Sequence, residues 1–135
     1  MTTKPQTITI ELPVSDQFCR DVLCTAVEGG SNYWASFAVL DSHQGEYGSE
    51  YQRVQATDEE SDDGKTWIVG LDELREGMRR LVHQDYSNKA SHATPHPQYS
   101  AAMVAALRDD DAGQVDANLA DIIFQLAAFG HIVYG

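Results

Sequence analysis

Hydrophobic and polar positions recur along the chain with two periods, and each period predicts a different kind of element. Alternation at every second residue is typical of a half-buried strand, whereas a spacing of three and four residues is typical of an amphipathic helix. The predicted strands cover residues 7–12, 33–40, 50–56 and 66–69. The predicted helices cover residues 15–27, 72–83, 98–108 and 116–129. Together they predict an α+β fold, in which a small antiparallel β-sheet of three to four strands is packed by about four helices.

Local signals define the ends and the neighbours of these helices. Ser15 is a good N-cap for the first helix, and Gly29 and Gly30 are suited to end it. Gly77 lies inside the second helix, where a glycine costs about 1 kcal/mol relative to alanine. That cost predicts that another element packs closely against the helix at this point.

A chain of 135 residues is long enough to form a single domain, residues 1–135, with a core of its own. Residues 85–97 hold two prolines and no hydrophobic period, so we expect a mobile linker there. The last six residues, GHIVYG, are rich in apolar side chains. We therefore expect the C-terminal tail to dock on the domain as a strand or plug rather than to fray.

Acidic residues outnumber basic ones by 21 to 9, which gives a formal net charge of −12. Such a charge repels phosphate backbones and anionic lipids, so we expect neither direct nucleic-acid binding nor membrane binding. It attracts basic surfaces, many of which hold nucleic acid, so one hypothesis is an acidic nucleic-acid mimic. Solubility alone also explains an acidic surface. The charge is densest between residues 58 and 63, and the candidate partner-binding residues are Asp58, Glu59, Glu60, Asp62 and Asp63.

Cysteine and histidine positions do not predict a metal site or a cofactor. Cys19 and Cys24 are five residues apart, which places them about 140° apart around a helix. They therefore cannot pair, and we expect buried free thiols in a reducing compartment. His92 and His96 have the spacing of helical metal ligands, but the prolines beside them exclude a regular helix. No apolar run reaches the roughly 18 residues of a membrane span, and no secretory signal begins the chain, so a cytoplasmic location is expected.

The segment from residue 28 to residue 34 leaves a helix, turns through two glycines and enters a strand. Adjacent strand residues face opposite sides of a sheet, so one of its two aromatic rings is expected at the surface. A ring beside a glycine turn can stack on a base, which suggests a small-nucleotide site. The candidate ligand-binding residues are Glu28, Gly29, Gly30, Asn32, Tyr33 and Trp34, with Arg53, Arg79 or Arg80 on the phosphate. Helix capping and ordinary aromatic packing explain the same residues without a ligand.

Two stretches of the chain resemble blocks found in small uncharacterised acidic proteins of phages and mobile elements. The stretch LCTAVEGGSNYW is similar to a block written EGGxxYW, and the C-terminal ADIIFQLAAFGHIVYG is similar to a block written FGxxVYG. The resemblance covers about a fifth of the chain. It implies a genomic context rather than a chemistry: an accessory protein that acts in the host cytoplasm on host or defence machinery, for example of the CRISPR type.

No motif of a common enzyme class is found, since the sequence contains no GxSxG, no P-loop and no GxGxxG. No catalytic residue is therefore assigned, and a binding protein is expected rather than an enzyme. In one hypothesis the acidic face blocks a basic groove on a host or defence protein, and binding weakens with salt. In the other the domain sequesters a small nucleotide, and the acidic run is dispensable. A homo-oligomer is compatible with both, because two-sided aromatics and an apolar tail can form an interface.

Overall fold

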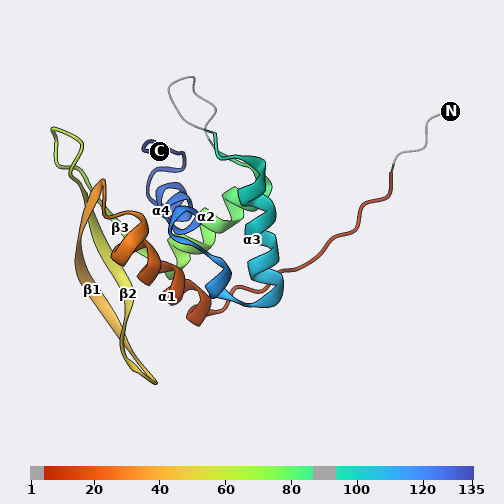
Figure 1. Cartoon of the computed structure of the whole chain (residues 1–135), viewed down its shortest axis with the longest axis horizontal. Helices are drawn as coiled ribbons and strands as arrows, with labels where there is room; N and C mark the ends of the chain where they lie inside the picture. The colour runs from red at the N-terminus through yellow and green to blue at the C-terminus, as the bar shows by residue number, and fades with distance from the viewer. Residues whose placement is uncertain (1–4, 87–93) are drawn as a thin grey trace.

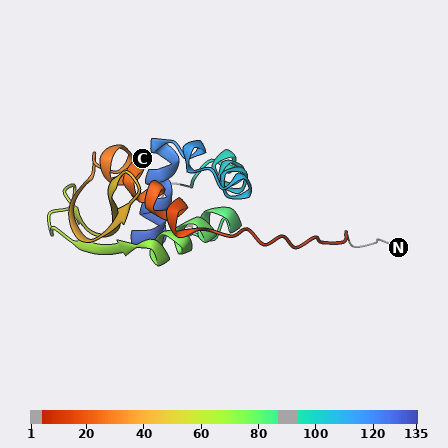
Figure 2. The same cartoon turned by 90° about the horizontal axis from the view of Figure 1, so that it is seen from below.

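A computed structural model describes residues 5–86 and 94–135, and it confirms the α+β fold. An antiparallel sheet with strand order β1-β2-β3 lies on one side of the molecule, and the helices are stacked beside it (Figure 1). The strands are β1 (Ala35–Gly45), β2 (Gly48–Asp58) and β3 (Thr66–Gly70). The helices are α1 (Asp16–Thr25), α2 (Leu71–His83), α3 (Pro97–Asp109) and α4 (Ala117–Phe129). Seen from below, α3 is the helix farthest from the sheet (Figure 2).

Helix α4 forms the centre of the core. Its sequence is apolar on most sides, which is typical of a helix that is covered by neighbours all round. It packs against α1, α2 and β3, and its side chains Leu119, Ile123, Phe124 and Leu126 are fully buried. The helix begins where the Asp116 side chain accepts a hydrogen bond from the Leu119 amide at 2.8 Å. One face of the sheet and the four helices thus share a single core.

Gly77 confirms the close approach that its position inside a helix predicts. It is buried in α2, where a Cβ atom would lie 2.5 Å from the carbonyl oxygen of Ile123 in α4. A side chain of any size would therefore push the two helices apart. The glycine weakens the isolated helix and permits this close packing.

The N-terminal strand predicted at residues 7–12 is wrong. Residues 5–15 form neither a helix nor a strand, and Ile8 and Ile10 are exposed. The segment extends away from the body on the side opposite the sheet (Figure 1). An alternating pattern makes a strand only where a second strand offers a hydrogen-bonding edge, and no described edge lies within reach of this segment. The sheet accordingly has three strands.

Other boundaries also differ from their predictions. Strand β1 runs to Gly45, five residues past the predicted end, because its polar second half pairs with β2 across a tight hairpin. Helix α1 begins as expected, with the Ser15 side chain accepting from the Phe18 amide at 3.1 Å. It ends in a π-helical turn, η1 (Ala26–Gly30), closed by a 2.8 Å bond from the Ser31 amide to the Ala26 carbonyl. Gly29 and Gly30 are part of this turn.

The predicted linker at residues 85–97 lies largely outside the described residues, which stop at 86 and resume at 94. Its described parts form no helix or strand before α3, and Tyr86 and Pro95 are buried. Within the described ranges, every helix is too short or too polar to span a membrane. Neither observation tests the prediction of a single domain, which therefore stays a prediction.

Candidate functional site

The two segments that carry the resemblance meet at one buried carboxylate, Asp121 of α4. Its Oδ1 atom accepts hydrogen bonds from the Ser31 hydroxyl at 2.7 Å and from the Trp34 indole nitrogen at 2.8 Å. Its Oδ2 atom accepts from the Tyr33 hydroxyl at 2.7 Å and from the Gln125 amide at 2.9 Å. Only 7% of Asp121 is exposed, so its charge is compensated by four neutral donors rather than by water.

Gln125, one turn after Asp121, fixes the C-terminal tail. Its amide oxygen accepts the backbone amides of Val133 and Tyr134, each at 2.9 Å, and its nitrogen donates to the Tyr134 carbonyl at 2.8 Å. Gly130 ends α4 with a φ of 77°, a left-handed conformation that suits glycine and turns the chain back. Ile132 is buried. The expectation that the tail docks as a plug is confirmed, and a side-chain amide takes the place of a partner strand.

The tail in turn reaches the acidic hairpin between β2 and β3. The Tyr134 hydroxyl donates to the Asp58 carboxylate at 2.7 Å, and the other Asp58 oxygen accepts the Glu60 amide at 2.9 Å. Burial and the neighbouring Asp58 charge raise the pKa of Tyr134 to about 12. Asp58 is only 5% exposed, so its carboxylate is not available to a partner. This corrects the candidate partner-binding set, in which Asp58 was grouped with exposed neighbours.

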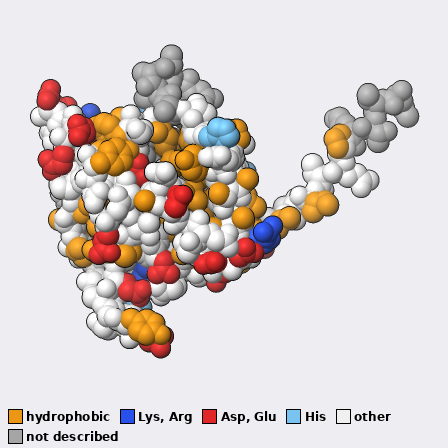
Figure 3. Space-filling view, in the orientation of Figure 1, with side chains coloured by type: hydrophobic (Ala, Val, Ile, Leu, Met, Phe, Trp, Pro, Cys, Tyr) orange, Lys and Arg blue, Asp and Glu red, His pale blue; other side chains and the backbone are white. Residues whose placement is uncertain are grey.

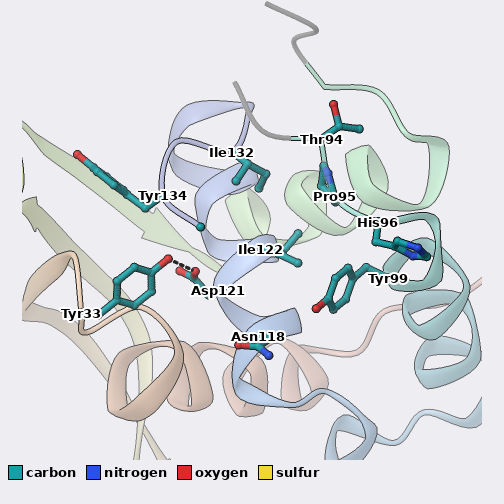
Figure 4. Close-up of a pocket in the computed structure, with 11 residues that line it drawn as sticks. Tyr33, Thr94, Pro95, His96, Tyr99, Asn118, Asp121, Ile122, Ile132 and Tyr134 are labelled. Carbon is teal, nitrogen blue, oxygen red and sulfur yellow. Dashed lines mark hydrogen bonds between the residues drawn. The ribbon is translucent and has the colours of Figure 1, made fainter. Parts of the chain in front are cut away.

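A cavity of about 560 Å³ opens beside this network, between the turn at Tyr33, the start of α3, helix α4 and the C-terminal tail. Figure 4 shows Tyr33 and Tyr99 on opposite sides of it, with Asp121 and Ile122 between them. The described residues that line it contain no lysine or arginine. They are Tyr33, Thr94, Pro95, His96, Tyr99, Asn118, Asp121, Ile122, Ile132, Tyr134 and Gly135.

One of the two adjacent aromatics is buried and the other exposed, as expected. Both lie, however, in the turn before β1, which begins at Ala35 rather than at residue 33, so strand alternation is not the cause. Trp34 is fully buried, 5.1 Å from the Phe129 ring and 5.4 Å from the Tyr134 ring, whereas Tyr33 is 50% exposed. Trp34 therefore offers no ring face to a base, and only Tyr33 reaches the cavity. Burial and the hydrogen bond to Asp121 raise the pKa of Tyr33 well above its usual range, so its hydroxyl keeps its proton.

The remaining nucleotide-site candidates are not brought together around this cavity. Gly29 and Asn32 are exposed, and Gly30 packs against the first turn of α4. Glu28 accepts from the Cys24 thiol at 3.0 Å and from the Tyr51 hydroxyl at 3.2 Å, on the surface between α1 and β2. These residues end a helix or pack against neighbouring elements, and they do not form a phosphate-binding site.

The three arginines proposed for a phosphate are all occupied. Arg53 pairs with Asp41 at 2.7 Å, and Arg79 and Arg80 pair with Glu76 at 2.7 and 3.4 Å. None of them lines the cavity. A phosphate group at Tyr33 would therefore meet carboxylates and ring faces without a countercharge.

Four acidic side chains of the β2–β3 hairpin are exposed, namely Glu59, Glu60, Asp62 and Asp63. In the space-filling view, the hairpin lies at the upper left corner, where acidic side chains cluster. Further acidic side chains lie along the lower part of the face, below a central hydrophobic area (Figure 3). All six arginines of the chain are engaged by carboxylates elsewhere. Within the hairpin itself, residues 58–66, Lys65 is the one basic side chain.

Both cysteines are free, as expected. Cys19 is buried, and burial raises its thiol pKa to about 11. Cys24 is partly buried, and burial together with the neighbouring Glu28 raises its pKa to about 11 as well. A protonated thiol is a weak nucleophile and a weak metal ligand. Among the described residues, no three histidine, cysteine or acidic side chains are arranged to hold a metal ion.

Asp121, Gln125 and Tyr134 were not among the candidate residues, although they organise the site. A signal for two of them exists: after the first turn of this helix, Asp121 and Gln125 are its polar residues. They are four apart, so both lie on one face of the helix. Buried polar side chains of this kind require partners. Those partners come from residues about 90 positions earlier and from the tail, and the helix pattern contains no information about them.

Comparison with known proteins gives no relative. No protein family matches the chain, and no curated protein and no solved structure is similar to it. The resemblance to proteins of phages and mobile elements therefore stays a prediction.

Proposed function

We propose that this protein binds a basic surface on a host or defence protein through its β2–β3 hairpin and thereby keeps nucleic acid off that surface. The observation that carries the proposal is the group of four exposed carboxylates at the hairpin tip, in a chain whose arginines are all paired elsewhere. Uncompensated negative charge attracts basic grooves and speeds association with them. A protein bound in such a groove excludes a phosphate backbone from it.

The anchoring of the hairpin supports this proposal. Asp58 at its base is held by the Tyr134 hydroxyl, and the Glu59 carboxylate accepts a bond from the Ser36 hydroxyl on β1. The Glu59 amide also donates to the Trp34 carbonyl at 2.9 Å. A hairpin that is ordered before binding loses less conformational entropy in the complex. The tip thus presents its charges on a fixed support.

The nucleotide hypothesis is less favoured. It requires a stacking ring at Tyr33 or Trp34 and a cation for the phosphate. Trp34 is fully buried, which leaves Tyr33 alone, and the described cavity lining beside Tyr33 has no lysine or arginine. The acidic hairpin requires only a basic partner. We therefore propose the hairpin as the binding site. Binding of a nucleotide instead would be detected in the experiments described below.

The proposal predicts that neutralising the hairpin weakens partner binding. The variant Glu59→Gln/Glu60→Gln/Asp62→Asn/Asp63→Asn keeps side-chain shape and removes four charges. The partner is captured from host lysate with the wild-type protein, identified by mass spectrometry, purified and titrated by calorimetry. We expect the variant to bind at least about tenfold more weakly, and wild-type binding to weaken with rising salt.

A matched control separates the hairpin from net charge. The variant Glu11→Gln/Asp21→Asn/Glu46→Gln/Asp111→Asn also removes four exposed carboxylates, on other elements of the chain. It should bind the partner within about threefold of wild type, since distant surface charges contribute little. Equal weakening by both variants would show that only the net charge matters. Unchanged binding by the hairpin variant would exclude the hairpin as the contact.

A further inference from the structure

We propose that the cavity between Tyr33 and Tyr99 receives the guanidinium group of an arginine side chain from the bound partner. This inference rests on the proposed function, because it takes the partner to be basic. It assigns a role to a cavity that the hairpin proposal does not use. The occupant is argued from the size of the cavity, the groups that line it, and its connection to the hairpin.

The cavity is large enough for a side chain, and its walls combine flat apolar and aromatic surfaces with a few polar atoms. Ile122 and Ile132 form apolar wall, and the rings of Tyr33 and Tyr99 stand on opposite sides (Figure 4). A guanidinium group is planar, weakly hydrated and attracted to the face of an aromatic ring. The apolar walls can pack against the methylene stem of an arginine, and the ring faces can stack on the plane of its guanidinium group.

The polar groups of the cavity include acceptors that a donor-rich ligand can use. The Tyr33 hydroxyl donates its hydrogen bond to Asp121 and accepts a long one, at 3.4 Å, from the Gln125 amide, so it presents a lone pair rather than a proton to a ligand. The Asn118 amide forms no side-chain hydrogen bond to another described residue, so its oxygen is available as an acceptor. Nδ1 of His96 accepts the Gln98 amide at 3.1 Å, so this nitrogen offers no donor to a ligand. Guanidinium carries five donors and no acceptor, which matches these groups.

The charge of the cavity has the sign that this ligand requires. Asp121 is buried, its four partners are neutral, and no described lysine or arginine lines the cavity. Both carboxylate oxygens already accept two bonds each, so a ligand would interact with the field of Asp121 rather than displace its partners. In a partly buried site that field is weakly screened. A phosphate or a carboxylate would be repelled, and a neutral ligand would gain nothing from it.

The position of the cavity links it to the partner rather than to a free metabolite. Tyr134 lines the cavity, and its hydroxyl holds Asp58 at the base of the acidic hairpin. The cavity and the base of the hairpin are therefore joined through one side chain. A basic partner that meets the hairpin places its own arginines close to this opening.

The two tryptophans provide a direct test on the full chain. The Trp34 indole N–H donates to Asp121, whereas Trp67 is outside the cavity lining, so the Trp67 indole signal in an ¹H–¹⁵N spectrum is an internal reference. The probe is N-acetyl-arginine-N-methylamide, compared with its neutral citrulline isostere, with agmatine and with AMP. We expect a saturable shift of the Trp34 signal only, with a Kd on the order of 1 mM for arginine and at least tenfold weaker binding of citrulline.

Matched variants complete the test. Tyr99→Leu keeps an apolar side chain in the cavity wall and should abolish the shift, while Tyr47→Leu, at a tyrosine that is 96% exposed on the β1–β2 hairpin, should leave it unchanged. Equal binding of citrulline, a shift caused by AMP, or no shift with arginine would overturn the inference. Agmatine binding tenfold tighter than the arginine probe would identify a free guanidinium compound and overturn the assignment to a partner. The hairpin variants change no cavity residue, so their failure and the failure of this titration are separate results.

Discussion

Replacing Asp121 with alanine is expected to lower the free energy of unfolding by about 3–5 kcal/mol. The substitution removes the common acceptor of Ser31, Tyr33, Trp34 and Gln125, and three of these donors come from residues about 90 positions away in the chain. Each buried donor left without a partner costs about 1–3 kcal/mol. Water that enters from the cavity can bond to some of these donors and so reduces the total cost. Urea denaturation followed by tryptophan fluorescence measures the effect.

The control for this prediction is Asp116→Ala on the same helix. Asp116 is exposed and caps α4 through a single bond to the Leu119 amide, so its loss should cost only about 1 kcal/mol. The difference between the two variants reports the buried network rather than the loss of an acidic residue from α4. If Asp121→Ala cost no more than Asp116→Ala, the network would not hold the two segments together.

Gly30→Ala is expected to destabilise the protein by about 2–3 kcal/mol. A Cβ atom there would overlap the carbonyl oxygen of Ala117 and lie 3.3 Å from the backbone nitrogen of Asp121. Both obstacles are backbone atoms, so the clash can be relieved only if η1 moves away from α4. That movement would lengthen the bonds from Ser31 and Trp34 to Asp121, and the Trp34 indole signal should shift as well. Chemical denaturation and the indole spectrum together test both consequences.

Gly29→Ala is the matched control, one residue earlier in the same turn. A Cβ atom at Gly29 would meet no atom within 4 Å, and its φ is not positive. Alanine should therefore change stability by no more than about 0.5 kcal/mol and leave the Trp34 signal in place. Equal effects of the two substitutions would mean that the turn is sensitive to any side chain and that its contact with α4 is not the cause.

Much of the fold follows from local patterns in the sequence. The helices around Leu74, Met103 and Ile123 are marked by long apolar periods, and caps such as Ser15 are recognisable from residue type alone. The N-terminal segment shows the limit of this approach, because its alternation is as regular as that of a real strand. Whether such a segment pairs depends on a partner edge elsewhere in the molecule, which a local pattern does not contain.

The site was less accessible to sequence reasoning than the fold. Asp58 belongs by composition to the acidic run, and only the docked tail, through Tyr134, separates it from its exposed neighbours. Asp121 becomes the centre of a network only when η1 is placed against α4. Both residues act through contacts between segments that are distant in sequence, so their roles depend on tertiary packing.

The two stretches that carry the resemblance lie together in space. The letters that define it include Tyr33, Trp34 and Tyr134. The same two stretches also hold Asp121 and Gln125, and the five residues form one hydrogen-bonded and stacked network. In this chain the two stretches pack the segment after η1, helix α4 and the tail together. The resemblance therefore bears on the fold, while the partner must be argued from the charged hairpin and the cavity.

The most direct test of the proposed function is a competition between this protein and nucleic acid for the captured partner. A fluorescent oligonucleotide is bound to the purified partner, and its anisotropy is followed as the protein is added. The proposal predicts that the anisotropy falls to the value of free oligonucleotide, and that the hairpin variant requires at least about tenfold more protein. A complex in which partner, protein and oligonucleotide stay together, with the anisotropy still high, would contradict it.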